Sequence, residues 1–391
     1  MSDKTTSIYI HVPFCVKKCF YCNFYSITNL SLIPSYINCL LKEIEFAKSN
    51  KSNEIDTIYF GGGTPSILSI KDIDLIINAL VKKFNISPAA EISFEINPDV
   101  FDLPQRKVKK KEYLKGLKEL GINRLSIGVQ SFNTKKLKFL QRMHNFKQAM
   151  GTINEAFDQN FKNINIDLIY ALPIETKKGL RKDLNKALDF APSHLSCYML
   201  VQEKNTCFDM KIKSKQIKAI KRLKAVKFFK FVSTFLENAG YEHYETSSFA
   251  KNSKTFSKHN LKYWDTALSY KGFGPGAHSY DTKTRYYNHA DLKKYIQCIE
   301  KDKVAVKAWE NLSYKQKMLE MIMLNLRTKK GINIKRFNDL FDIKFEKLFG
   351  EIVKNLQSTS FGNIENQRFF LNLKGMSYLD NIVESFAKRI I

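Results

Sequence analysis

Short runs of apolar and β-branched residues recur through the first half of the chain, and amphipathic stretches separate them. The runs predict six strands, at residues 8–12, 57–60, 91–96, 124–129, 163–168 and 194–199. Between them, apolar positions repeat at helical spacing in residues 36–47, 70–84 and 134–157. Strands and helices that alternate at this period pair in parallel through right-handed crossovers. The pattern predicts an α/β fold with a partial (β/α)6 TIM-like barrel, because a closed barrel has eight such units.

Near residue 300 the alternation of strands and helices stops, and the pattern predicts a smaller, mainly helical domain. Residues 318–327 predict a helix that enters a turn, and alternating apolar residues at 369–373 predict a strand before a last helix. Winged-helix modules have this order of elements. Some of them bind DNA, so that this domain could be a DNA-binding module or a docking surface.

Polar residues and glycines follow the carboxyl ends of the first five predicted strands, where parallel α/β folds build their sites. These segments cover residues 15–22, 61–66, 95–98, 128–131 and 167–170. Each has a simple structural alternative, such as a tight turn, a helix cap, an ion pair with a surface lysine or a hydrogen bond at a strand end. Their convergence on one edge of the sheet favours a functional site.

Cys15, Cys19 and Cys22 offer three thiolates within eight residues. A [4Fe-4S] cluster held by three protein thiolates keeps one iron open to a second molecule. A structural zinc site usually combines two ligand pairs, and the chain has no second CxxC motif or close histidine pair among its 7 cysteines and 7 histidines. The spacing favours the cluster, while zinc, a disulfide with a spare thiol and ordinary buried cysteines remain alternatives.

The composition is that of a folded, soluble protein, with 391 residues of which 44% are hydrophobic. No apolar stretch approaches the roughly 18 residues of a membrane span. The polar start of the chain has no signal-peptide core. An odd number of cysteines without a secretory signal indicates a reducing compartment, so we expect a cytoplasmic protein.

The net charge of +26 raises the question of a polyanionic partner. Lysine outnumbers arginine 54 to 10 and is spread along the whole chain, whereas arginine is the better reader of phosphate groups. These counts favour charged solvated faces and no nucleic-acid partner. The densest stretches, 106–111 and 211–230, predict helix surfaces. Apolar residues recur at helical spacing beneath the lysines of the second stretch, so peripheral membrane association remains an alternative there.

Six motifs follow one another in order. They are Tyr9-Ile-His-Val-Pro-Phe-Cys15-xxx-Cys19-Phe-Tyr21-Cys22, Gly61-Gly-Gly-Thr-Pro, Glu95-Ile-Asn-Pro, Ser126-Ile-Gly-Val-Gln130-Ser-Phe, Arg142-Met-His144 and Ile166-Asp167-Leu-Ile-Tyr-Ala-Leu-Pro173. Together they resemble the radical S-adenosylmethionine (SAM) family around oxygen-independent coproporphyrinogen III oxidase. The resemblance covers about the first 280 residues and continues more weakly to the C-terminus.

The resemblance implies two cofactors and their contacts. Cys15, Cys19 and Cys22 would hold a [4Fe-4S] cluster, whose open iron would take the amino and carboxylate groups of SAM. The implied SAM contacts are Tyr9, Tyr21, Gly62, Gly63, Thr64, Glu95, Gln130, Arg142 and Asp167. Asp167 suits ribose hydroxyls, and Arg142 suits a carboxylate.

Two functions diverge within this family, and the chain carries markers for the choice. The oxidase has a fourth cysteine two residues after the third, and an extension ahead of the barrel. Here that position is Phe24, and only eight residues precede Tyr9. The subgroup that lacks both features consists of haem chaperones. It also carries an HNxxYW motif, which is present here as His259, Asn260, Tyr263 and Trp264.

The HNxxYW motif suits haem, because an imidazole can ligate iron and aromatic rings can cover a flat macrocycle. The structural alternative is a surface histidine beside an aromatic pair packed in the core. His278, in the segment Gly272-Phe-Gly-Pro-Gly-Ala-His278, is a second and weaker ligand candidate. The resemblance favours a lid or docking surface over DNA binding for the C-terminal domain.

We therefore expect a haem chaperone that passes haem to apoproteins of respiration, as a monomer or a dimer. The alternative is a coproporphyrinogen III dehydrogenase, a radical SAM oxidative decarboxylase. The expected parts are a barrel at 1–235, a haem-motif region packed on it at 236–300 and a helical, winged-helix-like domain at 301–391.

Overall fold

A computed structural model describes residues 6–49, 51–103, 106, 108–302 and 304–390. The chain forms two compact units, and each unit draws on two separate stretches. The first unit comprises residues 1–220 and 268–310, and the second comprises 221–267 and 311–391. The sequence pattern predicts instead three consecutive parts, at 1–235, 236–300 and 301–391.

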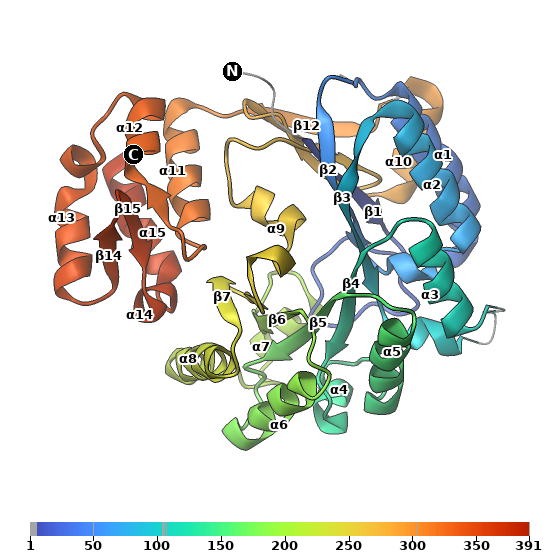
Figure 1. Cartoon of the computed structure of the whole chain (residues 1–391), viewed down its shortest axis with the longest axis horizontal. Helices are drawn as coiled ribbons and strands as arrows, with labels where there is room; N and C mark the ends of the chain where they lie inside the picture. The colour runs from blue at the N-terminus through green and yellow to red at the C-terminus, as the bar shows by residue number, and fades with distance from the viewer. Residues whose placement is uncertain (1–5, 50, 104–105, 107, 303, 391) are drawn as a thin grey trace. The chain divides into compact units, whose positions relative to one another are not determined.

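Six parallel strands form the centre of the first unit (Figure 1). They are β1 (Thr6–Val12), β2 (Glu54–Gly62), β3 (Asn85–Ile96), β4 (Arg124–Gln130), β5 (Asn163–Tyr170) and β6 (His194–Met199). They lie side by side in chain order, and each neighbouring pair is parallel. The predicted α/β fold and its six strands are confirmed.

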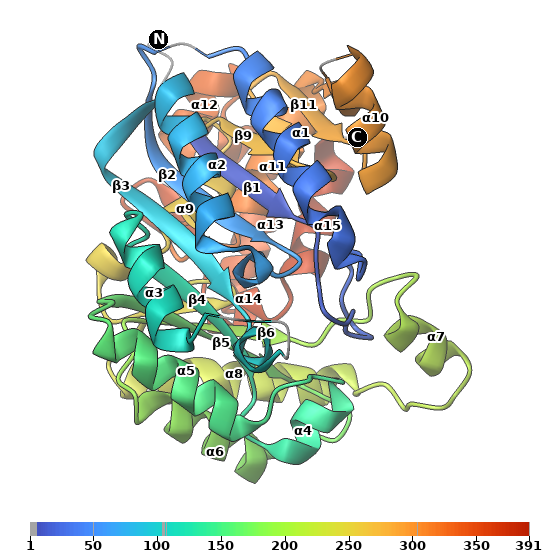
Figure 2. The ribbon, with the colours of Figure 1, turned by 90° about the vertical axis from the view of Figure 1, so that its right-hand side faces the viewer.

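Amphipathic helices cover this sheet because each buries one apolar stripe. They are α1 (Ile33–Phe46), α2 (Ile70–Lys83), α3 (Lys110–Glu119), α4 (Thr134–Phe139), α5 (Phe146–Asp158), α6 (Lys177–Leu188) and α7 (Cys207–Lys213). In Figure 2, α1, α2 and α3 lie over one face of the strands. A capping box of Ser69 and Asp72 starts α2.

The sheet of the first unit continues beyond β1, which the sequence analysis did not predict. β9 (Tyr270–Phe273) pairs in parallel with β1, and three more strands follow. These strands are β10 (His278–Tyr280), β11 (Thr284–Asn288) and β12 (Val306–Asn311), with α10 (Leu292–Asp302) before the last of them. The pairs β9–β10 and β10–β11 are antiparallel. The buried Glu43 carboxylate of α1 holds this extension, because it accepts hydrogen bonds from Gly274 N, Asn288 Nδ2 and Tyr295 Oη.

The second unit is mainly helical, as predicted. Its helices are α8 (Arg222–Asn238), α9 (Lys258–Tyr263), α11 (Tyr314–Asn325), α12 (Ile334–Phe341), α13 (Phe345–Ser358), α14 (Leu373–Met376) and α15 (Leu379–Ile390). Its strands are the hairpin β7 (Glu242–Glu245) and β8 (Ser248–Ala250), and the sheet of β13 (Ile332–Asn333), β15 (Arg368–Leu371) and β14 (Gly362–Glu365). Five phenylalanine rings pack together at its core, from Phe337, Phe345, Phe349, Phe369 and Phe386.

Two predicted helices are wrong in their extent. The stretch 134–157 is interrupted, because α4 ends at Phe139 and α5 begins at Phe146, with Gln141 in a left-handed conformation between them. The lysine-rich stretch 211–230 divides between α7 and α8, with Lys215 in a left-handed conformation. Of the described residues in the stretch 106–111, Lys110 and Lys111 alone belong to a helix, α3. The continuous amphipathic face proposed for a membrane surface therefore does not form.

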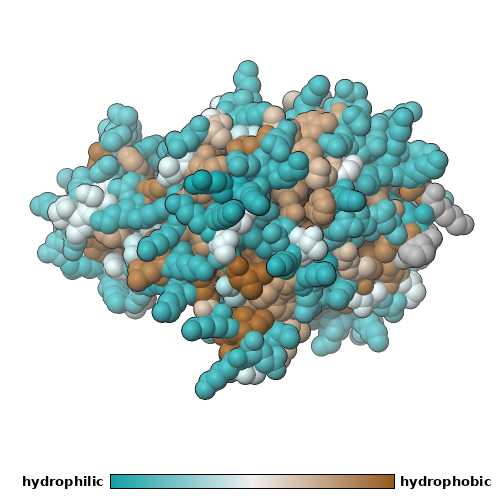
Figure 3. Space-filling view, turned by 90° about the horizontal axis from the view of Figure 1, so that it is seen from below, coloured by the Kyte–Doolittle hydropathy of each residue, from teal (hydrophilic) through white to brown (hydrophobic). Residues whose placement is uncertain are grey.

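Hydrophilic side chains predominate on the face shown in Figure 3, and apolar side chains gather toward its lower edge. This distribution agrees with lysines spread over solvated surfaces. Within the described ranges, no helix combines the length and apolar character needed to cross a membrane.

Candidate functional site

The carboxyl ends of the parallel strands surround one cavity of about 550 Å³. All the predicted cluster and SAM residues except Tyr9 line it, namely Cys15, Tyr21, Cys19, Cys22, Gly62, Gly63, Thr64, Glu95, Gln130, Arg142 and Asp167. They come from segments that follow β1 to β5 and from the break between α4 and α5. The tertiary structure thus brings together residues that are far apart in the sequence.

The three cysteines lie on a loop that follows β1. Backbone hydrogen bonds close its base, since Cys15 N donates to Ile27 O at 2.9 Å and Ile27 N donates to Pro13 O at 2.7 Å. Burial raises the pKa of the Cys15 and Cys22 thiols because desolvation disfavours the thiolate. A positively charged metal centre reverses that preference, so these thiols fit a metal cofactor.

The three cysteine thiols lie in the wall of the cavity. Among the residues that the structure describes, no three His, Cys, Asp or Glu side chains are grouped to hold one metal ion. The three thiols instead share the wall of one larger cavity. Two side chains already contact them, because Thr64 Oγ1 lies 3.6 Å from Cys15 Sγ and Arg142 Nη1 lies 3.5 Å from Cys19 Sγ.

Arg142 lies in the break between α4 and α5 and reaches the cavity wall. Its Nη2 donates to Gly128 O at 3.1 Å and to Asn97 Oδ1. Its Nε is buried and has no hydrogen-bond partner. A buried guanidinium nitrogen without a partner is costly unless a ligand satisfies it. This position therefore fits the carboxylate contact that the sequence analysis predicts.

Two glycines at the carboxyl end of β2 line the cavity. Gly62 has φ +107°, and a Cβ there would lie 2.7 Å from the His11 ring. A Cβ at Gly63 would lie 2.6 Å from the carbonyl oxygen of Phe14. Neither position has room for a side chain, so only glycine fits at these two places in the cavity wall. Gly63 N already donates to Val12 O at 2.8 Å, which agrees with the tight-turn alternative. The predicted contact of these glycines with SAM stays a prediction.

Two buried carboxyl groups face the same cavity. Glu95 Oε1 accepts a hydrogen bond from Tyr59 Oη at 2.8 Å, and burial raises the pKa of Glu95 to about 7. Asp167 accepts from Ser126 Oγ at 2.9 Å and from Asn165 Nδ2 at 2.7 Å, and burial raises its pKa as well. A cationic or hydroxyl-bearing ligand would restore the solvation that these carboxyl groups lack.

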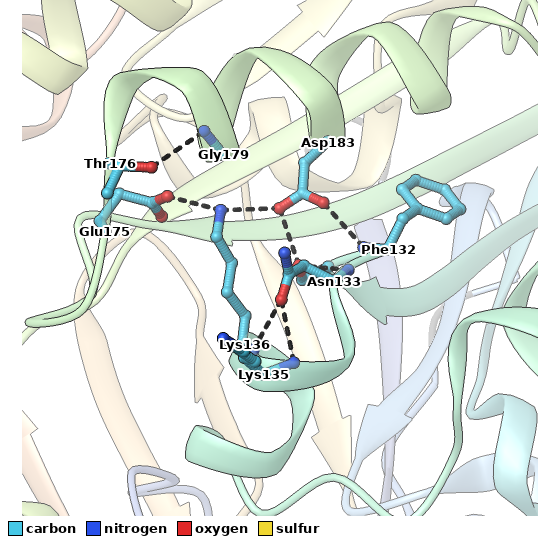
Figure 4. A network of polar contacts seen from close by, with 9 residues as sticks. Phe132, Asn133, Lys135, Lys136, Glu175, Thr176, Gly179 and Asp183 are labelled. Carbon is cyan, nitrogen blue, oxygen red and sulfur yellow. Dashed lines mark hydrogen bonds and ion pairs between the residues drawn. The ribbon is translucent and has the colours of Figure 1, made fainter.

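Gln130 ends β4 with φ +64°, a conformation that is strained for a residue with a Cβ. The turn that follows it is tied to α6, since Ser131 Oγ and Phe132 N both donate to the Asp183 carboxylate, at 2.7 and 3.0 Å. Lys136 Nζ lies 2.8 Å from Asp183 Oδ2 and 2.5 Å from Glu175 Oε1, and all three side chains are buried (Figure 4). We call Lys136, Glu175 and Asp183 the buried ion triad.

Tyr9 is not among the lining residues of the cavity. Its ring stacks on Tyr59 at a centroid distance of 6.2 Å, and Tyr59 does line the cavity. Its Oη lies 3.1 Å from Nδ1 of His11, whose Nε2 lies 2.9 Å from Tyr25 O. The predicted contact of Tyr9 with SAM stays a prediction.

Several lining residues were missed from the sequence. Tyr59, Asn97 and Ser126 contact predicted residues directly. Period-two alternation around Gly61 and Glu95 could have indicated Tyr59 and Asn97. The mouth of the cavity also carries exposed apolar side chains, from Phe24, Tyr198 and Val201. Those after β6 have no sequence signal, because a single exposed apolar residue is ordinary in any protein.

The HNxxYW motif lies on α9 of the second unit. His259 is 1% exposed, and its Nε2 lies 2.9 Å from Tyr263 Oη in the same helix. The alternative of a surface histidine is therefore wrong. Trp264 Nε1 is buried without a hydrogen-bond partner, and Arg327 lies over the indole at 5.6 Å. Asn260 N donates to Ser257 Oγ, the cap of α9, at 3.4 Å.

Comparison with known proteins agrees with the fold and the cavity. Residues 9–187 match the family model described as the radical SAM superfamily, and residues 312–378 match the HemN C-terminal domain. The solved structure of coproporphyrinogen III oxidase (HemN) from Escherichia coli superposes with a TM-score of 0.82, covering 98% of this chain and 90% of that chain at 23% identity. A strand-end cavity with three loop cysteines on this fold defines a radical SAM protein.

Relatives along the full length narrow this class. The chain is 32% identical to heme chaperone HemW of Lactococcus lactis subsp. lactis, over 99% of this chain and 98% of that protein. It is 33% identical to heme chaperone HemW of Bacillus subtilis, over 94% and 96%. It is 36% identical to that of Buchnera aphidicola subsp. Acyrthosiphon pisum, over 98% of each. Within the radical SAM superfamily, the chain belongs to the HemW family.

Proposed function

We propose that this protein is a haem chaperone, which binds haem and transfers it to acceptor apoproteins, with those of respiration as the expected class. It would carry a [4Fe-4S] cluster on Cys15, Cys19 and Cys22, and SAM in the adjoining cavity. The bound cluster and SAM supply redox and radical chemistry. The chain holds them through the unpartnered Arg142 Nε, the bare backbone of Gly62 and Gly63, and the two buried carboxyl groups.

The observation that carries this proposal is the side chain at position 24. Phe24 lines the cluster cavity and is 68% exposed, at the position where the related oxidase has its fourth cysteine. An apolar ring cannot exchange protons or bind metal as a thiol does. This substitution supports a carrier over a porphyrinogen dehydrogenase, in agreement with the name shared by the relatives.

The HNxxYW motif is the proposed haem-binding element, through His259, Asn260, Tyr263 and Trp264. The contact between His259 Nε2 and Tyr263 Oη occupies one of the two ring nitrogens that can ligate iron. Haem ligation through Nε2 therefore requires that contact to open. The buried Trp264 Nε1 without a partner is a donor that a haem propionate could satisfy.

The test uses the purified full chain, reconstituted anaerobically with iron and sulfide. One sample is titrated with haem and then with an apocytochrome, while absorbance follows haem binding and transfer. A second sample receives coproporphyrinogen, SAM and a reductant. We expect haem binding and transfer in the first sample and no change of the porphyrinogen in the second.

Formation of protoporphyrinogen in the second sample would show a dehydrogenase and overturn the proposal. A His259→Ala variant should bind haem more weakly than the parent. His289→Ala is the control, because it also removes one imidazole but lies outside the HNxxYW motif. Equal haem affinity in all three proteins would remove His259 from the site without removing the function.

A further inference from the structure

The seven histidines differ in whether a haem iron could reach them. Five are buried, His11, His144, His194, His243 and His259, and each has a ring nitrogen in a hydrogen bond. His278 is exposed and His289 is partly exposed. In the described part of the chain, neither ring nitrogen of His278 has a hydrogen-bond partner. His278 is therefore an imidazole that can ligate a metal without breaking an existing contact.

The strand register places His278 on the same face of the sheet as the cofactor cavity. Tyr9 pairs with Tyr59, which lines the cavity, and also with Gly272 of β9. Tyr270 lies two residues before Gly272 and pairs with Tyr280 of β10. Because paired residues, and residues two apart on a strand, share a face, His278 projects from that face as well. Each strand adds about 4.8 Å across the sheet, so His278 lies about 10 Å from β1.

Aromatic rings and cations surround His278 on this face. Its ring stacks on Tyr287, its register partner on β11, at 5.0 Å and 21°. Lys307 Nζ of β12 lies over the Tyr287 ring at 5.9 Å, and the Arg285 guanidinium lies over the Tyr280 ring at 5.8 Å. We call His278, Tyr280, Arg285, Tyr287 and Lys307 the β10–β12 face. No such pair of an aromatic ring and a cation contacts His289 among the described residues.

The chemistry of this face matches that of haem. Haem is a flat apolar ring with an iron that accepts imidazole and two carboxylates at one edge. Tyrosine rings offer flat apolar area, and arginine and lysine pair with carboxylates. Burial and the nearby Arg285 lower the pKa of His278, so its imidazole is neutral at neutral pH and able to ligate.

Resting on the proposed function, we propose that haem binds on the β10–β12 face, with His278 as an axial ligand of its iron and Arg285 and Lys307 paired with its propionates. This places the cargo on the same sheet face as the cluster and SAM. The HNxxYW motif on the second unit remains a separate haem contact, which His259→Ala tests independently.

The test of the ligand is spectroscopic and uses the full chain loaded with cluster and haem. Absorbance and electron paramagnetic resonance report the spin state and ligation of haem iron. We expect His278→Ala to lose the imidazole-ligated spectrum of the parent, and free imidazole added to the variant to restore it. His289→Ala is the control and should keep the parent spectrum. Unchanged circular dichroism and cluster iron content establish that the variants are folded.

If His278→Ala keeps the haem spectrum of the parent, His278 is not the ligand, and the proposed function still stands. A parent protein that binds no haem at all would overturn both, so the two failures differ. The propionate contacts are tested with haem and with its dimethyl ester. The double variant Arg285→Gln with Lys307→Gln should weaken haem binding by about tenfold and leave the ester unaffected. Equal weakening of both ligands would overturn the pairing.

Discussion

At the scale of single residues, the site depends on polar groups held away from water. Glu95 keeps its carboxyl in the wall of the cavity, where burial and the nearby Asp167 disfavour its charged form. Arg142 Nε is buried without a partner, and Gln130 adopts a strained backbone conformation. The Arg142 Nε and the Glu95 carboxyl would each gain from a ligand that supplies a partner. Backbone strain such as that at Gln130 is common at functional sites.

Glu95 gives the unliganded protein a specific pH dependence. Its pKa is about 7 in the folded state and near 4.5 in an unfolded chain. Between these two pKa values the folded state therefore binds more protons than the unfolded chain. The free energy of unfolding should fall as the pH rises through this range, by up to about 1.4 kcal/mol per pH unit. Glu95→Gln should remove this fall. Urea unfolding of the cluster-loaded protein without SAM, at intervals across this range, measures it.

The control for this experiment is Glu119→Gln, which removes an exposed carboxylate from α3. It should leave the slope of stability against pH as in the parent. If the parent and Glu95→Gln lose the same unfolding free energy between the unfolded and the folded pKa of Glu95, this interpretation of Glu95 is wrong.

At the scale of elements, the break between α4 and α5 is what brings Arg142 to the cavity. The amphipathic pattern of 134–157 continues through the break, but Gln141 turns the chain with φ +54°. The buried ion triad fixes α4 from the other side, because it joins the turn after β4 to α6 and to the segment after β5. The turn that follows β4 and the segment that follows β5 are thus held by one set of charges.

Breaking the buried ion triad should disturb SAM more than the cluster. Lys136→Met leaves two buried carboxylates without their cation, and such a loss costs about 3–5 kcal/mol of unfolding free energy. We expect the Lys136→Met variant to unfold at lower urea and to keep its iron content. Equilibrium dialysis should give a larger dissociation constant for SAM. Lys138→Met, on the exposed side of α4, is the matched control. Loss of stability with an unchanged SAM affinity would limit the triad to a structural role.

At the scale of the whole molecule, the predicted cofactor residues and the phenylalanine-rich core lie in different units. The cluster and SAM residues all belong to the first unit, and the HNxxYW motif belongs to the second. Most contacts lie within a unit, which favours unfolding in separate steps.

Removing one core ring should unfold the second unit first. Phe345 is fully buried, and Phe345→Ala should cost about 3–5 kcal/mol. We expect circular dichroism to show an early transition in urea while the cluster absorbance persists to higher concentration. Leu340→Ala, at a half-exposed position of α12, should leave the parent curve nearly unchanged. Simultaneous loss of both signals in Phe345→Ala would show that the units unfold as one.

The sequence predicted the parallel strands and most of the cavity because both leave local marks. A buried strand is a short apolar run, and a site at its carboxyl end adds polar residues near the end of that run, as at Glu95 in β3 and Asp167 in β5. The β9–β12 extension leaves no such mark, since its strands are short and partly exposed. The exposed apolar residues at the cavity mouth, such as Val201, are equally invisible without the fold.

The sequence alone determined the class of fold, the three thiols and the order of the motifs, because periodicity and spacing are properties of the chain itself. Only the tertiary structure decided that Tyr9 stands behind Tyr59, that His259 is buried against Tyr263, and that His278 shares a sheet face with the cofactor cavity. The physical reason is that burial and register arise from pairing between distant segments. Whether an imidazole can reach iron depends on what surrounds it after folding.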